Sequence, residues 1–219
     1  MILFASVIVL AVALGYLLGG RLRRFEEVYP RWWLLAILGL ALQFVPLPDG
    51  RGGTDLLVRD LMLGASYAML IAFAALNVRL PGVPLLMLGL ALNATVITAN
   101  GGMPVSREAL VRSGQADVLQ ELIDEGAAKH HLLTDDDVLT PLSDVIPIGD
   151  PIDQVASIGD VFVYAGLVWL TVAVMRGRTG ETSPQVRGRY RGKHRRSSAE
   201  EPADRTAPAP PPAATTWGT

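Results

Sequence analysis

The sequence predicts an all-α integral membrane protein, in which a five-transmembrane-helix bundle carries an extracytoplasmic, partly helical cap and a disordered cytoplasmic tail. Half of the 219 residues are hydrophobic and only 18% are charged, whereas about a quarter of the residues in a soluble domain are charged. Five apolar stretches approach the roughly 17–25 residues that a helix needs to cross a bilayer. The basic residues are also segregated along the chain, which is typical of a membrane topology.

The first four stretches fall within residues 1–99, and the fifth follows a long polar segment. The second is the weakest, because only the 14 residues WWLLAILGLALQFV precede a proline-containing exit, although paired tryptophans are typical of an interfacial anchor. A water-soluble bundle is not favoured because the stretches lack polar faces. A cleaved signal peptide is not expected because the bases of RLRR follow the apolar run. The predicted spans are residues 2–20, 32–48, 61–78, 83–99 and 158–175.

The distribution of lysine and arginine predicts the orientation of the chain. If all five stretches cross, fourteen of the nineteen basic residues fall on one side, which the positive-inside rule assigns to the cytoplasm. The N-terminus then lies outside and the C-terminus inside the plasma membrane of a bacterial cell. If the second stretch did not cross, the basic clusters would lie on opposite sides of the membrane.

The polar segment 100–157 is predicted to be an acidic cap on the outer face. Counted to Asp160, it contains twelve acidic and three basic residues. Ser106 is a suitable N-cap and Gly126 a suitable C-terminal stop, and Thr134 and Asp137 have the spacing of a capping box before a short helical turn. An amphipathic helix over residues 116–126 should place four aliphatic side chains against protein or lipid headgroups: Val118, Leu119, Leu122 and Ile123.

Three motifs in the sequence resemble a known family. NGGMPVS follows the fourth stretch, KHHLLTDDDVLTPLSDVIPI lies in the cap segment, and SIGDVF opens the fifth stretch. Together they are similar to a family of small bacterial multi-pass membrane proteins catalogued only as a domain of unknown function. The resemblance covers about residues 1–176. It implies this membrane layout, and it assigns no activity and no functional residue.

Two adjacent histidines precede three consecutive aspartates in the cap, at residues 130–131 and 135–137. Adjacent side chains diverge on a helix or a strand, which does not favour a metal site. His131 and Asp135 are four residues apart and could form a polar or metal-binding cluster on one helical face, but the aspartates are better interpreted as helix-capping acids. The alternating spacing of a calcium loop is absent. We therefore expect no bound metal and no cofactor.

Polar residues at membrane depth define a candidate pocket. Asn93 and Asn100 share a face of the fourth span, and Asp160 lies at the outer end of the fifth. Such residues often serve only as interhelical hydrogen-bonding groups, and Ser157 and Asp160 have the spacing of a capping box, but an acid within a span is also a functional candidate. We predict that Asp160 lies within contact distance of the Asn100–Met103 turn and bonds backbone amides there or at its own helix start.

Small residues at intervals of four occur on the first and third spans. This spacing allows two helices to approach closely, either within one bundle or across a homodimer interface. The positions are Ala11, Gly15 and Gly19 on the first span, and Gly64, Ala68 and Ala72 on the third.

Residues 176–219 are predicted to form a disordered tail, because a basic stretch is followed by a proline- and alanine-rich stretch with little to bury. Nucleic-acid binding is not expected, since the basic stretch has neither interleaved aromatic residues nor a folded module. Six bases could hold anionic lipid headgroups, although topology alone also explains them: Arg187, Arg189, Arg191, Lys193, Arg195 and Arg196.

The sequence favours a non-enzymatic membrane protein that binds a protein partner or a small ligand at the cell envelope. The alternative is a small transporter or enzyme that uses the outer pocket of Asn93, Asn100 and Asp160. Convergence of these three residues on one cavity, covered by the cap, would favour the alternative. The lipid bilayer is the one partner that the sequence identifies.

Overall fold

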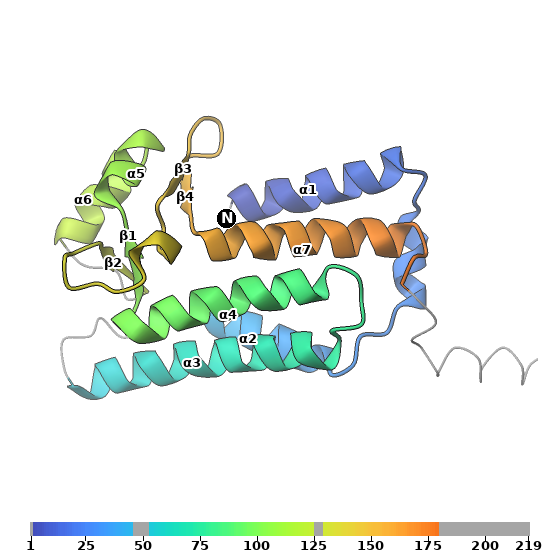
Figure 1. Cartoon of the computed structure of the whole chain (residues 1–219), viewed down its shortest axis with the longest axis horizontal. Coiled ribbons are helices and arrows are strands. Elements are labelled where there is room, and N and C mark those ends of the chain that lie inside the picture. Colours follow the sequence, from blue (N-terminus) through green and yellow to red (C-terminus); the bar gives the residue numbers. More distant parts are fainter. Residues whose placement is uncertain (1, 46–52, 125–128, 180–219) are drawn as a thin grey trace, which may run out of the picture. The chain divides into compact units, whose positions relative to one another are not determined.

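A computed structural model shows a mostly helical protein in which two small β-sheets accompany the helices (Figure 1). The structure describes residues 2–45, 53–124 and 129–179, which all belong to one compact unit, Met1–Thr182. Three predicted features lie outside the described residues: the tail from residue 180 with its six bases, the helix stop at Gly126, and the proline-containing exit of the second span.

Five apolar helices form the larger part of the described chain. The last has the predicted bounds, and the fourth extends one residue further than predicted, to Asn100. The third begins at Gly53, eight residues before the predicted start, so the polar residues ahead of Leu61 form helical turns instead of a loop. The first ends three residues early because Gly19 has a positive φ of 78°. The helices are α1 (Ile2–Leu17), α2 (Trp33–Phe44), α3 (Gly53–Leu76), α4 (Val83–Asn100) and α7 (Ile158–Met175).

Three of these helices are long and apolar enough to cross a membrane: Leu56–Leu76 within α3, all of α4, and all of α7. Helices α1 and α2 are apolar but shorter, with 16 and 12 residues. At a rise of about 1.5 Å per residue they extend about 24 Å and about 18 Å, whereas the hydrocarbon core is about 30 Å thick.

The helices lie side by side in the order α1, α7, α4, α3, with α2 packed on α3 (Figure 1). Glycines bring α4 and α7 closest together. A Cβ atom on Gly89 would collide with the main-chain carbonyl of Gly159, and one on Gly166 would collide with the backbone of Leu86. Such close backbone approach is the usual way in which helices pack in lipid.

The two predicted stripes of small residues have different environments. On α1, Ala11 is fully buried and Gly15 contacts Met175 of α7, so these two positions pack within the unit, whereas Gly19 is exposed. On α3, a Cβ atom added to Gly64 would meet no described atom within 4 Å, and Ala68 is exposed. The stripe on α3 therefore faces open space in a single copy of the described chain.

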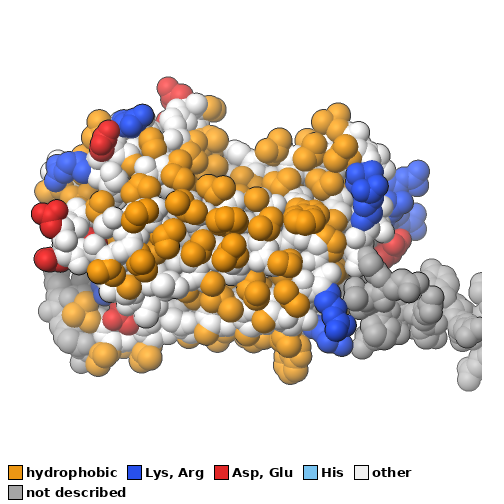
Figure 2. Space-filling view, viewed as in Figure 1, with side chains coloured by type: hydrophobic (Ala, Val, Ile, Leu, Met, Phe, Trp, Pro, Cys, Tyr) orange, Lys and Arg blue, Asp and Glu red, His pale blue; other side chains and the backbone are white. Residues whose placement is uncertain are grey.

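Charged side chains concentrate over the cap and at the opposite ends of the helices, and hydrophobic side chains cover the face between them (Figure 2). At one end, the main-chain N–H of Arg21 and the guanidinium of Arg24 donate to the carbonyl oxygen of Met175, at 2.8 and 3.1 Å. At the other end, the Leu3 N–H donates to Oε1 of Gln154 at 2.9 Å. Helix α1 is thus attached to the end of α7 and to the cap segment.

The cap consists of two short helices and two two-stranded sheets between α4 and α7. Strand β1 (Met103–Val105) pairs in parallel with β2 (His130–Leu132), and β3 (Ile146–Ile148) pairs antiparallel with β4 (Gln154–Ala156). These four strands depart from the all-α prediction. Each has three residues, which is too short to show the alternating pattern of a strand in the sequence.

The helices of the cap begin as predicted. Helix α5 (Arg107–Arg112) is capped by Ser106, whose hydroxyl accepts from the Ala109 N–H, and α6 (Ala116–Asp124) follows it. The predicted aliphatic stripe of α6 divides: Leu122 is buried and Leu119 packs beside it, but Val118 and Ile123 are exposed. The small cap core contains Val105, Leu110 and Leu122, with Leu119, Leu132 and Val155 packed against it.

Candidate functional site

Asn93 and Asp160 meet where α4 packs against the start of α7. Ser157 and Asp160 form the predicted capping box: the Asp160 N–H donates to the Ser157 hydroxyl at 3.0 Å, and the Ser157 N–H donates to Oδ2 of Asp160 at 3.1 Å. The Asn93 amide donates to Oδ1 of Asp160 at 2.7 Å, and its carbonyl oxygen accepts from the Ser157 hydroxyl at 3.0 Å. The carboxylate of Asp160 therefore bonds its own helix start and α4.

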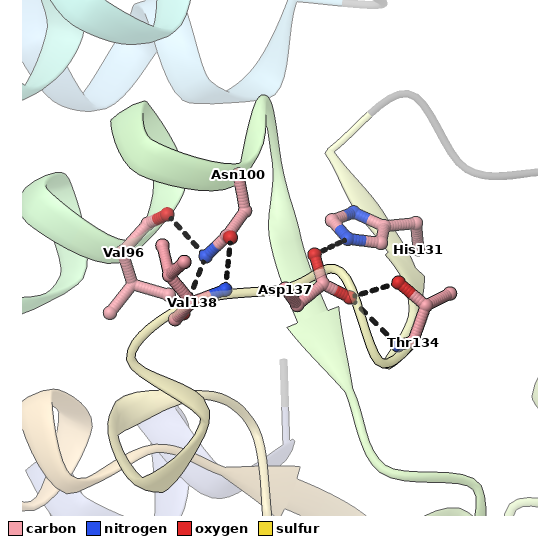
Figure 3. A network of polar contacts seen from close by, with 6 residues as sticks. All are labelled: Val96, Asn100, His131, Thr134, Asp137 and Val138. Carbon is pink, nitrogen blue, oxygen red and sulfur yellow. Dashed lines mark hydrogen bonds and ion pairs between the residues drawn. The ribbon is translucent and has the colours of Figure 1, made fainter.

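Asn100 has a different role from Asn93. Its side-chain amide donates to the carbonyl oxygens of Val96 and Val138, both at 3.0 Å, and its own oxygen accepts from the Val138 N–H at 2.9 Å (Figure 3). Asn100 thus fastens the cap to the end of α4. Asp160 accepts from the Ser157 N–H at its own helix start, which is the second of the two positions expected for it, and Asn100 makes the bonds at the turn.

The histidine and aspartate cluster also pairs differently from the prediction. His131 Nε2 lies 2.8 Å from Oδ1 of Asp137, not beside Asp135, and Oδ2 of Asp137 accepts from the N–H and hydroxyl of Thr134 (Figure 3). The prediction assumed helical spacing, but His131 lies in β2 and a turn follows it. No helix starts at Thr134; a single 3₁₀ turn forms later, at Thr140–Leu142. In the described ranges, no three His, Asp or Glu residues are grouped so that they could hold a metal ion.

A polar cavity of about 140 Å³ lies between the cap and the ends of the helices next to it. Its volume is several times the roughly 30 Å³ that one water occupies in the liquid. Asn93 and Asp160 line it, but Asn100 does not. The wall comes from three apolar helices of the bundle, from α7 and from the cap: Gln43, Leu63, Tyr67, Asn93, Ile97, Met103, Lys129, His130, Asp144 and Asp160.

Asp144 is an acid of this cavity that was not predicted as a site residue from the sequence. Its backbone is paired with the first strand, because its N–H donates to the Pro104 carbonyl at 3.0 Å and its carbonyl accepts from the Ser106 N–H at 2.9 Å. This pairing holds the residue in a buried position, with 8% of its surface exposed. Nothing in the sequence distinguishes it from the other acids of the segment.

The Asp144 carboxyl group accepts no hydrogen bond from the residues that the structure describes. Within the described part of the chain, Oδ1 is buried without a hydrogen bond, and Oδ2 lies 3.9 Å from His130 Nε2, which is too long for one. Burial, and secondarily the negative charge of Asp160, raise the pKa of this carboxyl to about 8. A buried acceptor without a donor costs stability, so a donor from a proton or a ligand would be favourable here.

Lys129 closes one side of the cavity. Its ammonium group donates to the main-chain carbonyl of Gln43 near the end of α2, so it links this helix to the cap. Burial lowers the pKa of the Lys129 amine. Since this cation already has an acceptor in the wall, the Asp144 carboxyl is the polar group of the cavity that is most in need of a partner.

A second cavity, of about 250 Å³, lies within the cap and shares His130 and Asp144 with the first. Polar side chains of Gln115, Glu121 and Gln154 line it together with apolar residues of the cap core. His130 and Asp144 therefore stand between a cavity in the cap and a cavity at the bundle.

Fold and site together define a mostly helical protein with three helices able to cross a membrane and a polar cavity beneath a small mixed cap. The chain belongs to the family of unknown function DUF5317, which matches residues 27–172. It is 28% identical to an uncharacterized protein of Thermotoga maritima over 177 residues, which cover 80% of this chain and 93% of that protein. No solved structure matches the chain. The resemblance to a family of unknown function is thereby confirmed, and the comparisons assign that family no activity.

Proposed function

We propose that the protein is a five-span membrane protein of the bacterial plasma membrane that binds a small polar ligand, without catalysis, beneath its extracytoplasmic cap. The ligand lies in the cavity at the cap and donates a hydrogen bond to Asp144. The observation that carries this proposal is Asp144, a residue that lines the cavity and whose buried Oδ1 atom has no hydrogen bond in the described chain. An unpaired buried acceptor is costly to keep unless something binds it.

The attachments of α1 support a crossing by this short helix. Its first turn bonds Gln154 of the cap, and the residues that follow it bond Met175 at the far end of α7. Helix α7 is itself long enough to cross. A segment fastened at both ends of a spanning helix covers the same distance across the bilayer.

The ends of the helices support the proposed orientation. Basic residues follow the first, third and fifth apolar helices, which are α1, α3 and α7. The acidic cap follows the fourth, α4. The positive-inside rule assigns the basic end to the cytoplasm. The six bases of the tail, from Arg187 to Arg196, are then available to anionic lipids of the inner leaflet.

The alternative is a small transporter or enzyme, and the polar residues further from the cap do not favour transport. Ser66 of α3 donates to the Gly39 carbonyl at 2.8 Å, and Asn77 bonds the backbone of Arg31 through both side-chain atoms. These groups fasten α3 to the chain around α2, as interhelical hydrogen bonds commonly do. They do not extend the cavity of Asp144 toward the basic end.

Native mass spectrometry of protein extracted from bacterial membranes tests the ligand. We expect the wild type to retain a small-molecule adduct and Asp144→Asn to lose most of it, because a ligand that donates a hydrogen bond favours the carboxylate form of Asp144 and an amide cannot ionise. Asp135→Asn is the matched control, since Asp135 is exposed in a cap turn and does not line the cavity. A wild type without any adduct, or equal adducts in all three proteins, would contradict the proposal.

A further inference from the structure

A groove of about 350 Å³ runs along the outer surface between α3 and α4. Three of the residues that line it are small: Gly64, Ala68 and Ala94. The open space beside Gly64 shows that no described side chain fills it. On α3 it extends from Asp60 to Ile71, a rise of about 16 Å, which is close to half of the roughly 30 Å hydrocarbon core.

The groove adjoins the polar cavity. Leu63, Tyr67 and Ile97 line both, so these three side chains form the boundary between them. One side of the boundary is polar and holds the unpaired Asp144 carboxyl; the other side is mainly apolar and opens between two helices that are long enough to span. A molecule that occupied both would need a polar head and a hydrocarbon chain.

The charged groups of the cavity indicate which polar head a bound molecule would have. Asp144 and Asp160 supply two carboxyl groups, and the one ammonium group among the lining residues, that of Lys129, already donates to Gln43. A primary ammonium supplies three donors and a positive charge, and it satisfies the Asp144 oxygen that has no partner. An anionic head would meet two acids instead.

We infer that the ligand is a membrane amphiphile with a primary amine head and a hydrocarbon chain, an inference that rests on the proposed function. Its head lies in the cavity beside Asp144, and its chain lies in the groove between α3 and α4. The amphiphile enters sideways from the outer leaflet, because the groove faces lipid along the depth of that leaflet when α3 and α4 cross.

A photoactivatable probe tests this placement. Full-length protein in phosphatidylcholine vesicles is irradiated with an octadecylamine analogue that carries a diazirine in the middle of its chain, and labelled peptides are mapped by mass spectrometry. We expect labels on residues 60–71 and 94–101. Ala68→Leu should abolish this labelling by filling the groove, and Asp144→Asn should weaken it, because an amide cannot become the carboxylate that pairs with an ammonium head.

Ala75→Leu is the matched control, because Ala75 is also exposed on α3 but does not line the groove. It should label like the wild type. Labels spread evenly over α1, α2 and α3 would overturn the inference. A dimer would also overturn it, if the groove of the wild type is not labelled in that dimer and Ala68→Leu dissociates it. A second copy of the chain would then occupy the groove.

Ethylammonium separates the inference from the proposed function. In one outcome, this short amine raises the thermal unfolding midpoint of the wild type but not of Asp144→Asn, and the long probe does not label the groove. The cavity then binds a ligand, but the inference that the ligand carries a hydrocarbon chain is wrong. If the short amine has no effect and the groove is not labelled, both are wrong.

Discussion

Replacing Asp144 with asparagine should raise the thermal unfolding midpoint of the ligand-free protein at pH 8 and should remove part of its pH dependence. The folded-state pKa of about 8 lies above the ordinary value for aspartate, because burial and Asp160 favour the protonated form. The stability that the bound proton contributes is fully present below the unfolded-state pKa of about 4 and is lost as the pH rises through about 8. One proton corresponds to a slope of about 1.4 kcal/mol per pH unit in this window.

The measurement is the unfolding midpoint in detergent from pH 5 to pH 9, for the wild type and Asp144→Asn. Other titratable groups face the same cavity: Tyr67 of α3, Lys129, His130 of β2, and Asp160 of α7. The difference between the two proteins isolates the proton of Asp144, because the other groups are present in both. A difference that stays constant with pH, or a variant less stable than the wild type at pH 8, would show that Asp144 is not buried as an unpaired acid.

Replacing Leu110 with alanine should unfold the cap while the apolar helices stay in the membrane. Leu110 is 2% exposed and packs with Val105 and Leu122 in the cap core. A buried Leu→Ala change costs about 2–5 kcal/mol, and a core of so few side chains has little else to compensate the loss. The spans should remain inserted because their backbone hydrogen bonds do not depend on the cap.

Trypsin treatment of spheroplasts measures this effect, because the cap contains three cleavage sites, at Arg107, Arg112 and Lys129. We expect cleavage of Leu110→Ala to be faster by roughly tenfold or more, as a loss of about 2 kcal/mol implies. The adjacent Val111 is 57% exposed, so Val111→Ala should be cleaved like the wild type. Similar rates for both variants would mean that Leu110 does not hold the cap together.

The sequence predicts the apolar helices well and the cap poorly, for physical reasons. The bounds of α7 were predicted correctly because a capping box opens a long apolar run that ends at a basic residue. The start of α3 was missed because its first turns contain Arg59 and Asp60. The prediction relied on the length of the apolar stretch, and this criterion excludes helical turns with charged residues. The cap strands were missed because their pairing joins residues far apart in the chain: Met103 pairs with His130, and Ile146 with Ala156.

The candidate site could be predicted only in part. Asn93 and Asp160 were identified because polar residues are unusual in apolar stretches, and the structure joins them. Asn100 met the same criterion but contacts the cap. Asp144 could not be identified, because its burial depends on backbone bonds to Pro104 and Ser106 that form only when the cap folds.

Cysteine accessibility in intact cells tests the central claim, a five-span protein with its cap outside, most directly. The chain has no native cysteine, so single cysteines at Ile2, Tyr29, Val78 and Asp117 report one position each; all four side chains are exposed in the structure. We predict that a membrane-impermeant maleimide labels positions 2 and 117 in intact cells, and labels positions 29 and 78 only after permeabilisation. Labelling of position 29 or 78 from outside, or protection of position 117, would contradict the account.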